Sequence, residues 1–173
     1  MRFEETLQKK ISYFPIPLIE YSKLVTFPVN YTNQYDVLFY GTMNGDRINI
    51  LNYIQKNLPF VKFRIVDNAF EKEIFYEICK SKIVLNIHFY KNANLETARL
   101  NEILSCKKLA ISFYPSTDEL LHYKLYKDQV VFVKDVHEMI QKINFYLNNK
   151  DEYNKIIQNI KFTDDKINIL DFL

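Results

Sequence analysis

The chain has 173 residues, of which 48% are hydrophobic and 25% are charged, and its formal net charge is +2. This composition is typical of one globular domain that buries a core, and it excludes a disordered chain. The small net charge, without any basic run, gives no reason to expect a nucleic-acid partner. No apolar run approaches the roughly 20 residues of a membrane span, so we expect a cytoplasmic protein with no membrane span.

The first 34 residues fit no regular element. Prolines follow closely on Phe14 and Phe27 and break any long helix there. We interpret residues 1–34 as a linker or the remnant of a preceding domain.

From residue 35 onward, short apolar runs alternate with segments of helical periodicity. The predicted strands are Asp36–Tyr40, Val61–Val66, Lys82–His88, Lys108–Phe113 and Gln129–Val133. The predicted helices are Arg47–Asn57, Glu71–Lys80, Leu95–Cys106, Thr117–Lys124, Val136–Leu147 and Lys150–Ile160.

Strands that are apolar almost throughout are buried on both faces, which is typical of a parallel sheet with helices on each side. The pattern therefore predicts an α/β fold: a doubly wound parallel sheet in a single Rossmann-like domain over residues 35–150. Residues 151–173 then form a carboxy-terminal helix and tail, and we expect the apolar end Ile167–Leu173 to pack back onto the domain.

The two glycines of the chain, Gly41 and Gly45, lie in one loop directly after the first predicted strand. Glycine adopts positive φ and lets the backbone approach a ligand, so this loop is a candidate nucleotide-binding turn. Its spacing matches neither the dinucleotide fingerprint nor a P-loop. A tight turn without a ligand is the alternative.

In a parallel sheet, ligands bind at the carboxyl ends of the strands. The loops there are Thr42–Arg47, Asp67–Phe70, His88–Asn94 and Tyr114–Thr117. The helix after the third strand places Glu96, Arg99 and Glu102 on one broad face. An exposed Glu96–Arg99 ion pair is the alternative to a binding role for these two residues.

Four segments together resemble a known family. They are Tyr35–Arg47, Lys82–Tyr90, Leu95–Cys106 and Lys108–Ser112. These segments resemble the carboxy-terminal, donor-binding half of a GT-B glycosyltransferase, and within that superfamily they are most similar to the group 1 enzymes of the spore-maturation-protein-like branch. The most specific piece is Leu95-Glu-Thr-Ala-Arg99 followed by Asn101-Glu102 and a strand.

The resemblance implies a metal-independent transferase that binds a nucleotide diphosphate sugar as substrate, with no cofactor and no metal site. It implies that the glycine loop and the amino end of the Leu95 helix approach the diphosphate, and that Glu102 holds the ribose hydroxyls. The donor-binding residues expected are Gly41, Thr42, Arg47, His88, Asn94, Glu96, Thr97, Arg99 and Glu102. No catalytic residue is assigned, and His88 has the alternative role of orienting its loop.

Two positions depart from the family pattern. The acidic residue that contacts the donor sugar is replaced by Asn94, and Glu96 is the nearest carboxylate. The glycine usual after the Ser-Cys turn is replaced by Lys107, which we expect to close a backbone route to the ligand.

GT-B transfer takes place between two Rossmann-like halves, and 34 residues are too few to form the acceptor half. We expect a donor domain that needs an acceptor half from a partner chain, or self-association over its open face, to transfer sugar. An isolated half that only binds nucleotide is a second interpretation. A degenerate, non-catalytic domain that serves as a structural or interaction module is the third.

Overall fold

The computed structural model describes Leu18, Glu20 and residues 33–67, 72–90, 93–115 and 126–162. In these residues five parallel strands form one sheet in the order β2-β1-β3-β4-β5. The strands are β1 (Tyr35–Tyr40), β2 (Phe63–Val66), β3 (Ser81–Asn86), β4 (Leu109–Phe113) and β5 (Val130–Val133). The helices are α2 (Gly45–Asn57), α3 (Lys72–Cys79), α4 (Thr97–Ser105), α6 (Val136–Asn148) and α7 (Lys150–Gln158). The predicted doubly wound parallel sheet is confirmed.

The chain reverses direction across the sheet at β1. It passes from β1 outward to β2 and then returns across β1 to β3, so β1 pairs with both strands in parallel. Val37, for example, lies opposite Phe63 on one side and Ile83 on the other. The loops that leave β1 and β3 therefore meet at one edge, where open α/β sheets form their ligand crevice.

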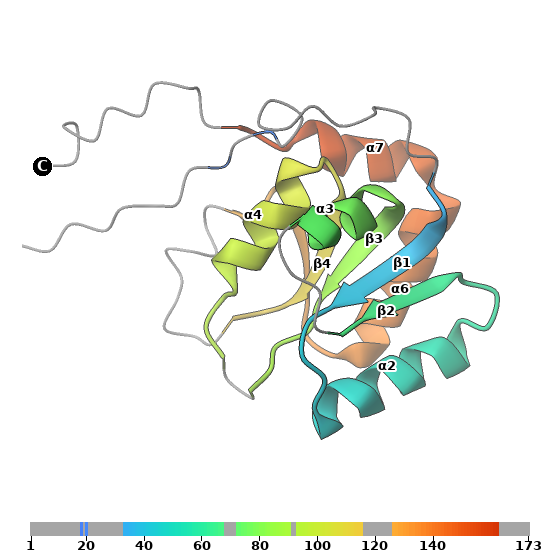
Figure 1. The fold of residues 1–173 in the computed structure, drawn as a ribbon. Coiled ribbons are helices and arrows are strands. Elements are labelled where there is room, and N and C mark those ends of the chain that lie inside the picture. Colours follow the sequence, from blue (N-terminus) through green and yellow to red (C-terminus); the bar gives the residue numbers. More distant parts are fainter. Residues whose placement is uncertain are drawn as a thin grey trace, which may run out of the picture.

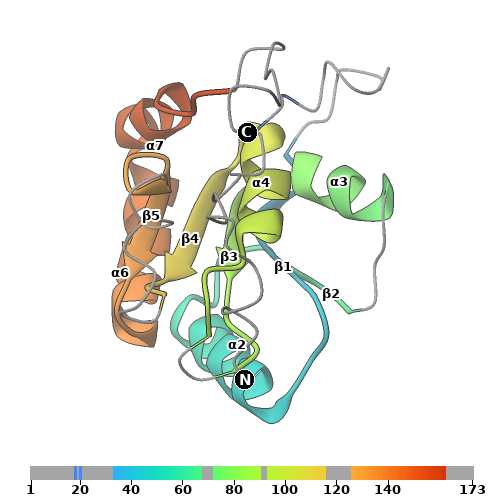
Figure 2. The same cartoon turned by 90° about the vertical axis from the view of Figure 1, so that its left-hand side faces the viewer.

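Helices cover both faces of the sheet because side chains alternate along each strand. Val37 and Phe39 face α2 and α6, where Leu51 and Met139 belong to the same buried cluster. Figures 1 and 2 show these two helices on the side of the sheet opposite α3 and α4. Each fully buried apolar side chain of this size contributes about 1.5–3 kcal/mol to folding.

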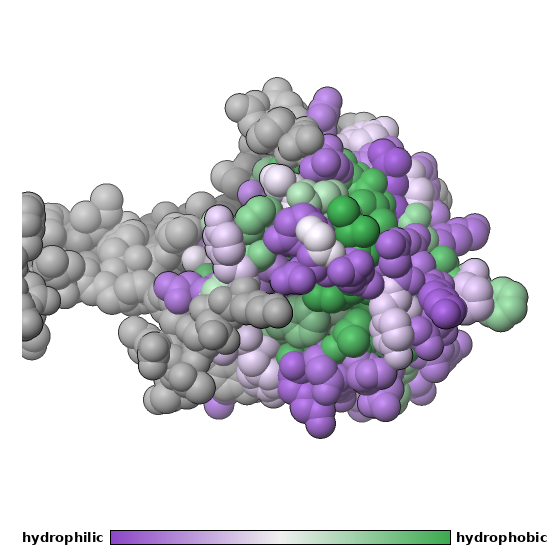
Figure 3. All heavy atoms as spheres, turned by 90° about the horizontal axis from the view of Figure 1, so that it is seen from below, coloured by the Kyte–Doolittle hydropathy of each residue, from purple (hydrophilic) through white to green (hydrophobic). Residues whose placement is uncertain are grey.

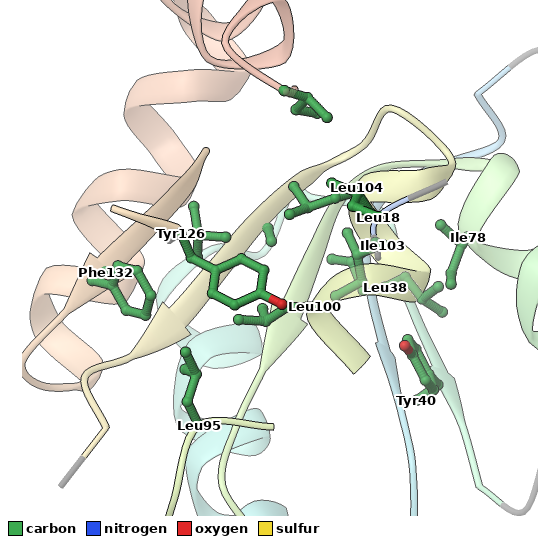
Figure 4. Close-up of a cluster of buried hydrophobic side chains, with 14 residues drawn as sticks. Leu18, Leu38, Tyr40, Ile78, Leu95, Leu100, Ile103, Leu104, Tyr126 and Phe132 are labelled. Carbon is green, nitrogen blue, oxygen red and sulfur yellow. The ribbon is translucent and has the colours of Figure 1, made fainter. Parts of the chain in front are cut away.

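The second buried cluster lies between the sheet and helices α3 and α4. Leu38 and Tyr40 of β1 pack there, as Figure 4 shows. From α4, the buried apolar side chains are Leu100, Ile103 and Leu104, the three that the helical periodicity directs into the core. Leu18 also belongs to this cluster, so part of the segment read as a linker packs on the domain.

The predicted element bounds agree with the observed ones to within about two residues, and the difference at the start of α2 is informative. That helix begins at Gly45 and not at Arg47, and Asn44 is its N-cap. The predicted helix Thr117–Lys124 and the tail Ile167–Leu173 lie outside the described residues. None of the described helices is long and apolar enough to cross a membrane. Cys79 and Cys106 are free thiols.

Lys107 follows the C-cap of α4 in a left-handed backbone conformation, with φ of 53°. This is the helix-terminal position that favours glycine, because a Cβ atom is strained there. The Lys107 ammonium lies 2.8 Å from Oε1 of Glu20 in a partly exposed ion pair. Lys107 therefore combines backbone strain with a weak electrostatic compensation.

Two substitutions of Lys107 separate the effect of the backbone strain from that of the ion pair with Glu20. Lys107→Ala loses the ion pair and keeps the strain, whereas Lys107→Gly loses the ion pair and relieves the strain. We expect Lys107→Gly to be about 1 kcal/mol more stable to unfolding than Lys107→Ala. Urea denaturation of both variants measures the difference, and equal stabilities would contradict the strained conformation.

Candidate functional site

Arg47 is a buried cation at the carboxyl edge of the sheet. Its side chain is only 2% exposed, on the first turn of α2. Nε and Nη2 both donate to the carbonyl oxygen of Ile87, at 3.0 and 2.7 Å, and Nη1 donates to that of Thr42 at 2.7 Å. Nη2 also lies 3.4 Å from Oε1 of Glu96. One guanidinium thus ties together the loop after β1, the loop after β3 and the start of α4.

Local sequence places Arg47 where it makes these contacts. Asn44 accepts a hydrogen bond from the Arg47 amide at 2.8 Å, which is the usual interaction of an N-cap side chain. The amide group of Asn44 donates to the carbonyl oxygen of Phe89 at 2.7 Å. The ring of Phe89 lies against the guanidinium, 5.1 Å from its central carbon. The helix start and the loop after β3 are thereby fixed to each other.

Burial affects the ionisation of Arg47. Desolvation by burial, and then the nearby charge of Arg99, lower the pKa of the guanidinium, and Glu96 partly opposes them. An arginine retains its charge under such shifts because its ordinary pKa is so high. A buried cation of this kind is tolerated only when its N–H groups have acceptors, and the carbonyl oxygens of Ile87 and Thr42 supply them.

Arg99 lies beside Arg47, on the first turn of α4. Its Nη1 atom lies 2.8 Å from Oε2 of Glu96, and the two groups form an ion pair that lacks hydrogen-bond geometry. The same Nη1 atom donates a hydrogen bond to Oδ1 of Asn86 at 3.4 Å. Arg99 is 16% exposed and Glu96 is 25% exposed. The predicted ion pair therefore exists, but it is half-buried at the sheet edge and Glu96 shares it with Arg47.

Gly41 faces the Arg99 guanidinium. A Cβ atom added to Gly41 would lie 2.7 Å from Nη2 of Arg99, and the φ of Gly41 is +127°. The backbone conformation requires glycine here, and a Cβ atom would also displace the end of the Arg99 side chain. Gly45 differs, because no atom lies within 4 Å of an added Cβ. Of the two glycines in the predicted loop, only Gly41 is required by its surroundings.

The electrostatic arrangement suits an anion. Two guanidinium groups share the carboxylate of Glu96, which leaves this group of three residues with a formal charge of +1. Arg47 directs its N–H groups at backbone carbonyls, whereas Nη2 of Arg99 donates to no described residue. Of the two, Arg99 is the cation with donors left for a ligand.

Glu102 lies one turn further along α4. Its Oε2 accepts a hydrogen bond of 2.7 Å from the hydroxyl of Tyr40, the last residue of β1. The carboxylate is therefore directed toward the carboxyl end of β1, which agrees with its expected position at the crevice. Burial, and then the charge of Glu102, raise the pKa of the Tyr40 hydroxyl, so Tyr40 stays a hydrogen-bond donor.

The remaining predicted residues lie around this group. Thr42 is exposed, and its backbone carbonyl oxygen accepts a hydrogen bond from Arg47. Asn94 is also exposed. Thr97 is the first residue of α4, and no side chain caps the start of this helix. Both ring nitrogens of His88 are buried, and no described residue hydrogen-bonds to them. The structure brings together Gly41, Arg47, Glu96, Arg99 and Glu102, and it places Asn94 and Thr97 at the rim.

The strands in Figures 1 and 2 point downward, so the view from below in Figure 3 faces this edge. Hydrophilic residues surround an apolar strip on this face of the molecule (Figure 3). A ligand that combines charge with an apolar ring would meet both kinds of surface there.

A family model described as glycosyl transferase-like matches residues 30–163, well over half of the chain. The chain belongs to this glycosyl transferase-like family. The model match and the parallel sheet together support a domain of the GT-B type. No curated protein sequence matches the chain at a significant level.

Sequence reasoning missed three polar residues of this glycosyl transferase-like domain. Asn44 caps α2, as described above. Asn86 and Ser112, at the ends of β3 and β4, are fully buried, and the Asn86 amide donates to the Ser112 hydroxyl at 3.0 Å. Their signal was a polar residue inside an apolar strand, at the carboxyl end, where a buried polar side chain needs a partner.

The expectation that Lys107 closes a backbone route to the ligand is wrong. Lys107 lies just before β4 begins, at the amino edge of the sheet, whereas the polar group lies at the carboxyl edge. The glycine of the family pattern is explained here by the left-handed end of α4, a stability feature.

The contrast between the two glycines gives a test. Gly41→Ala forces a Cβ against Arg99 at a φ that alanine rarely adopts, and we expect it to lower the free energy of unfolding by about 1–3 kcal/mol. Gly45→Ala, in the first turn of α2, is the matched control, and we expect it to be neutral or stabilising by about 0.5 kcal/mol. Thermal unfolding of the two variants compares them. Equal stabilities would contradict the positive φ of Gly41.

Proposed function

We propose that the chain binds a nucleoside diphosphate sugar as the donor half of a GT-B glycosyltransferase of group 1, in the spore-maturation-protein-like branch. The observation that carries this proposal is the presence of a cation and a carboxylate on α4, Arg99 and Glu102, at the carboxyl edge of a domain in the glycosyl transferase-like family. The donor domain in this proposal spans residues 35–150.

The diphosphate is proposed to lie between the Gly41 loop and the start of α4. Backbone amides at a helix start and the positive end of its dipole favour an anion. The N-cap residue Glu96 makes no capping bond, because its carboxylate is drawn to the two guanidinium groups. Arg99 would supply the bidentate donors. Arg47, with its N–H groups on backbone carbonyls, would act mainly by fixing the loop.

The ribose hydroxyls are proposed to bind Glu102. A carboxylate accepts two hydrogen bonds from a vicinal diol, one at each oxygen. The sugar is proposed to lie toward Asn94, which is exposed, and His88, whose ring nitrogens have no hydrogen-bond partner among the described residues. Glu96 would contact the sugar only by giving up part of its interaction with the arginines.

The acceptor side of the cleft is proposed to come from a partner chain. The described residues form one Rossmann-like sheet, and Arg99 and Glu96 at its carboxyl edge are partly exposed. Transition-state stabilisation in such a cleft requires groups on both sides. A donor half alone should bind its nucleotide weakly, because the pre-organisation that a closed cleft provides is missing.

Calorimetry with uridine, guanosine and cytidine diphosphates tests the proposal. We expect at least one of them to bind the full chain with a Kd in the millimolar range or tighter. Glu102→Ala and Arg99→Gln should each weaken that binding at least about tenfold, since each removes a charge-assisted hydrogen bond.

Glu73→Ala is the matched control, because Glu73 is exposed on the first turn of α3 and should not change the affinity. If none of the three diphosphates binds, or if Glu73→Ala weakens binding as much as Glu102→Ala, the proposed function is wrong.

A further inference from the structure

One aromatic side chain contacts both proposed ligand groups of α4. Tyr40 is 4% exposed, and Figure 4 shows its ring below α4 with the hydroxyl oxygen turned toward that helix. The hydroxyl donates to Oε2 of Glu102 at 2.7 Å. The ring lies 5.2 Å from the central carbon of the Arg99 guanidinium, in a cation–π contact. Tyr40 therefore holds the carboxylate with its hydroxyl and the cation with its ring.

These contacts keep Glu102 and Arg99 apart. The two residues are three positions apart on a helix, a spacing at which opposite charges attract each other. Arg99 instead lies on Glu96, and Glu102 bonds Tyr40. Without the Tyr40 hydroxyl, the Glu102 side chain would be free to rotate toward Arg99. The ligand would then meet an internal ion pair in place of a separate cation and carboxylate.

The hydrogen bond from Tyr40 also leaves room for a diol. A carboxylate has about four acceptor positions, and Tyr40 occupies one of them, on Oε2. No described residue hydrogen-bonds to the other positions on the two oxygens, and the bond to Tyr40 restricts rotation of the carboxylate. Two adjacent hydroxyls need that restricted orientation in order to bond both oxygens at once, whereas a single hydroxyl bonds either oxygen of a carboxylate in many orientations.

We propose that Tyr40 is the positioning residue that makes the site select ribose over 2′-deoxyribose nucleotides, by fixing the carboxylate of Glu102 for the vicinal diol. This inference rests on the proposed function, because it assigns the ribose to Glu102. It adds a specificity determinant in β1 that acts through a residue of α4.

The test compares Tyr40→Phe with Tyr126→Phe. Both changes remove a buried hydroxyl that donates a 2.7 Å hydrogen bond to a side chain of α4: Tyr40 bonds Glu102, and Tyr126 bonds Asn101. Both tyrosines belong to the same buried cluster, so each variant keeps an aromatic ring at a buried position. Tyr40→Phe retains the ring and its contact with Arg99, and we expect both variants to fold.

Calorimetry of the full chain with uridine or guanosine diphosphate, and with the matching 2′-deoxynucleotide, gives the readout. We expect wild type and Tyr126→Phe to bind the ribonucleotide about tenfold or more tightly than the deoxynucleotide. In Tyr40→Phe the ribonucleotide should weaken about tenfold while the deoxynucleotide changes less than about twofold, so the preference nearly disappears.

The outcomes separate the two proposals. If ribonucleotide and deoxynucleotide weaken equally in Tyr40→Phe, or if Tyr126→Phe loses the preference as well, Tyr40 acts only on stability and the inference is wrong while nucleotide binding stands. If wild type binds neither nucleotide, the proposed function fails and the inference fails with it.

Discussion

The carboxyl edge of this domain depends on one buried charge. The Arg47 guanidinium cannot leave its N–H groups unpaired inside the protein, and its acceptors are the Ile87 and Thr42 carbonyl oxygens and the Glu96 carboxylate. These acceptors come from two loops and the residue before α4. Removing such a cation while its partners stay buried typically costs about 3–5 kcal/mol. The geometry of the edge is therefore fixed by the cost of an unpaired charge.

Because of that constraint, Arg47 and Arg99 have different roles. Glu96 is drawn to both, so its side chain makes no capping bond to α4. Arg99 is placed by Glu96, by the ring of Tyr40 and by the absence of a side chain at Gly41. As a result, Arg47 holds the two loops in place, and Arg99 has an Nη2 group that donates to no described residue.

Sequence patterns predicted the sheet well because burial on both faces makes each strand apolar along its whole length. β3 and β4 are buried at nearly every position, and their sequences are correspondingly apolar, which predicts strands in both places. The pattern also placed Glu96, Arg99 and Glu102 on one face of α4. It treated Gly41 and Gly45 alike, although only Gly41 has a positive φ and a neighbour that a Cβ would displace. Local spacing carries no information about that neighbour, which is 58 positions away.

The contacts that define the site join residues far apart in the sequence, and helical or strand periodicity does not predict such contacts. Tyr40 and Glu102 are 62 positions apart, and Arg47 and Ile87 are 40 positions apart. Asn86 and Ser112 meet only because β3 and β4 pair in register. The sequence contained one usable hint, since polar residues at the ends of apolar strands require partners. The identity of each partner required the fold.

A crystal structure of the full chain with the nucleoside diphosphate that binds it would test the account most directly. The account predicts the diphosphate between Gly41 and the start of α4 within hydrogen-bond distance of Arg99, the ribose hydroxyls on Glu102, and unchanged bonds from Arg47 to Ile87. A nucleotide at the opposite edge, in the depression lined by Lys82 and Tyr153, would contradict it. So would a diphosphate that draws the Arg47 guanidinium away from Ile87.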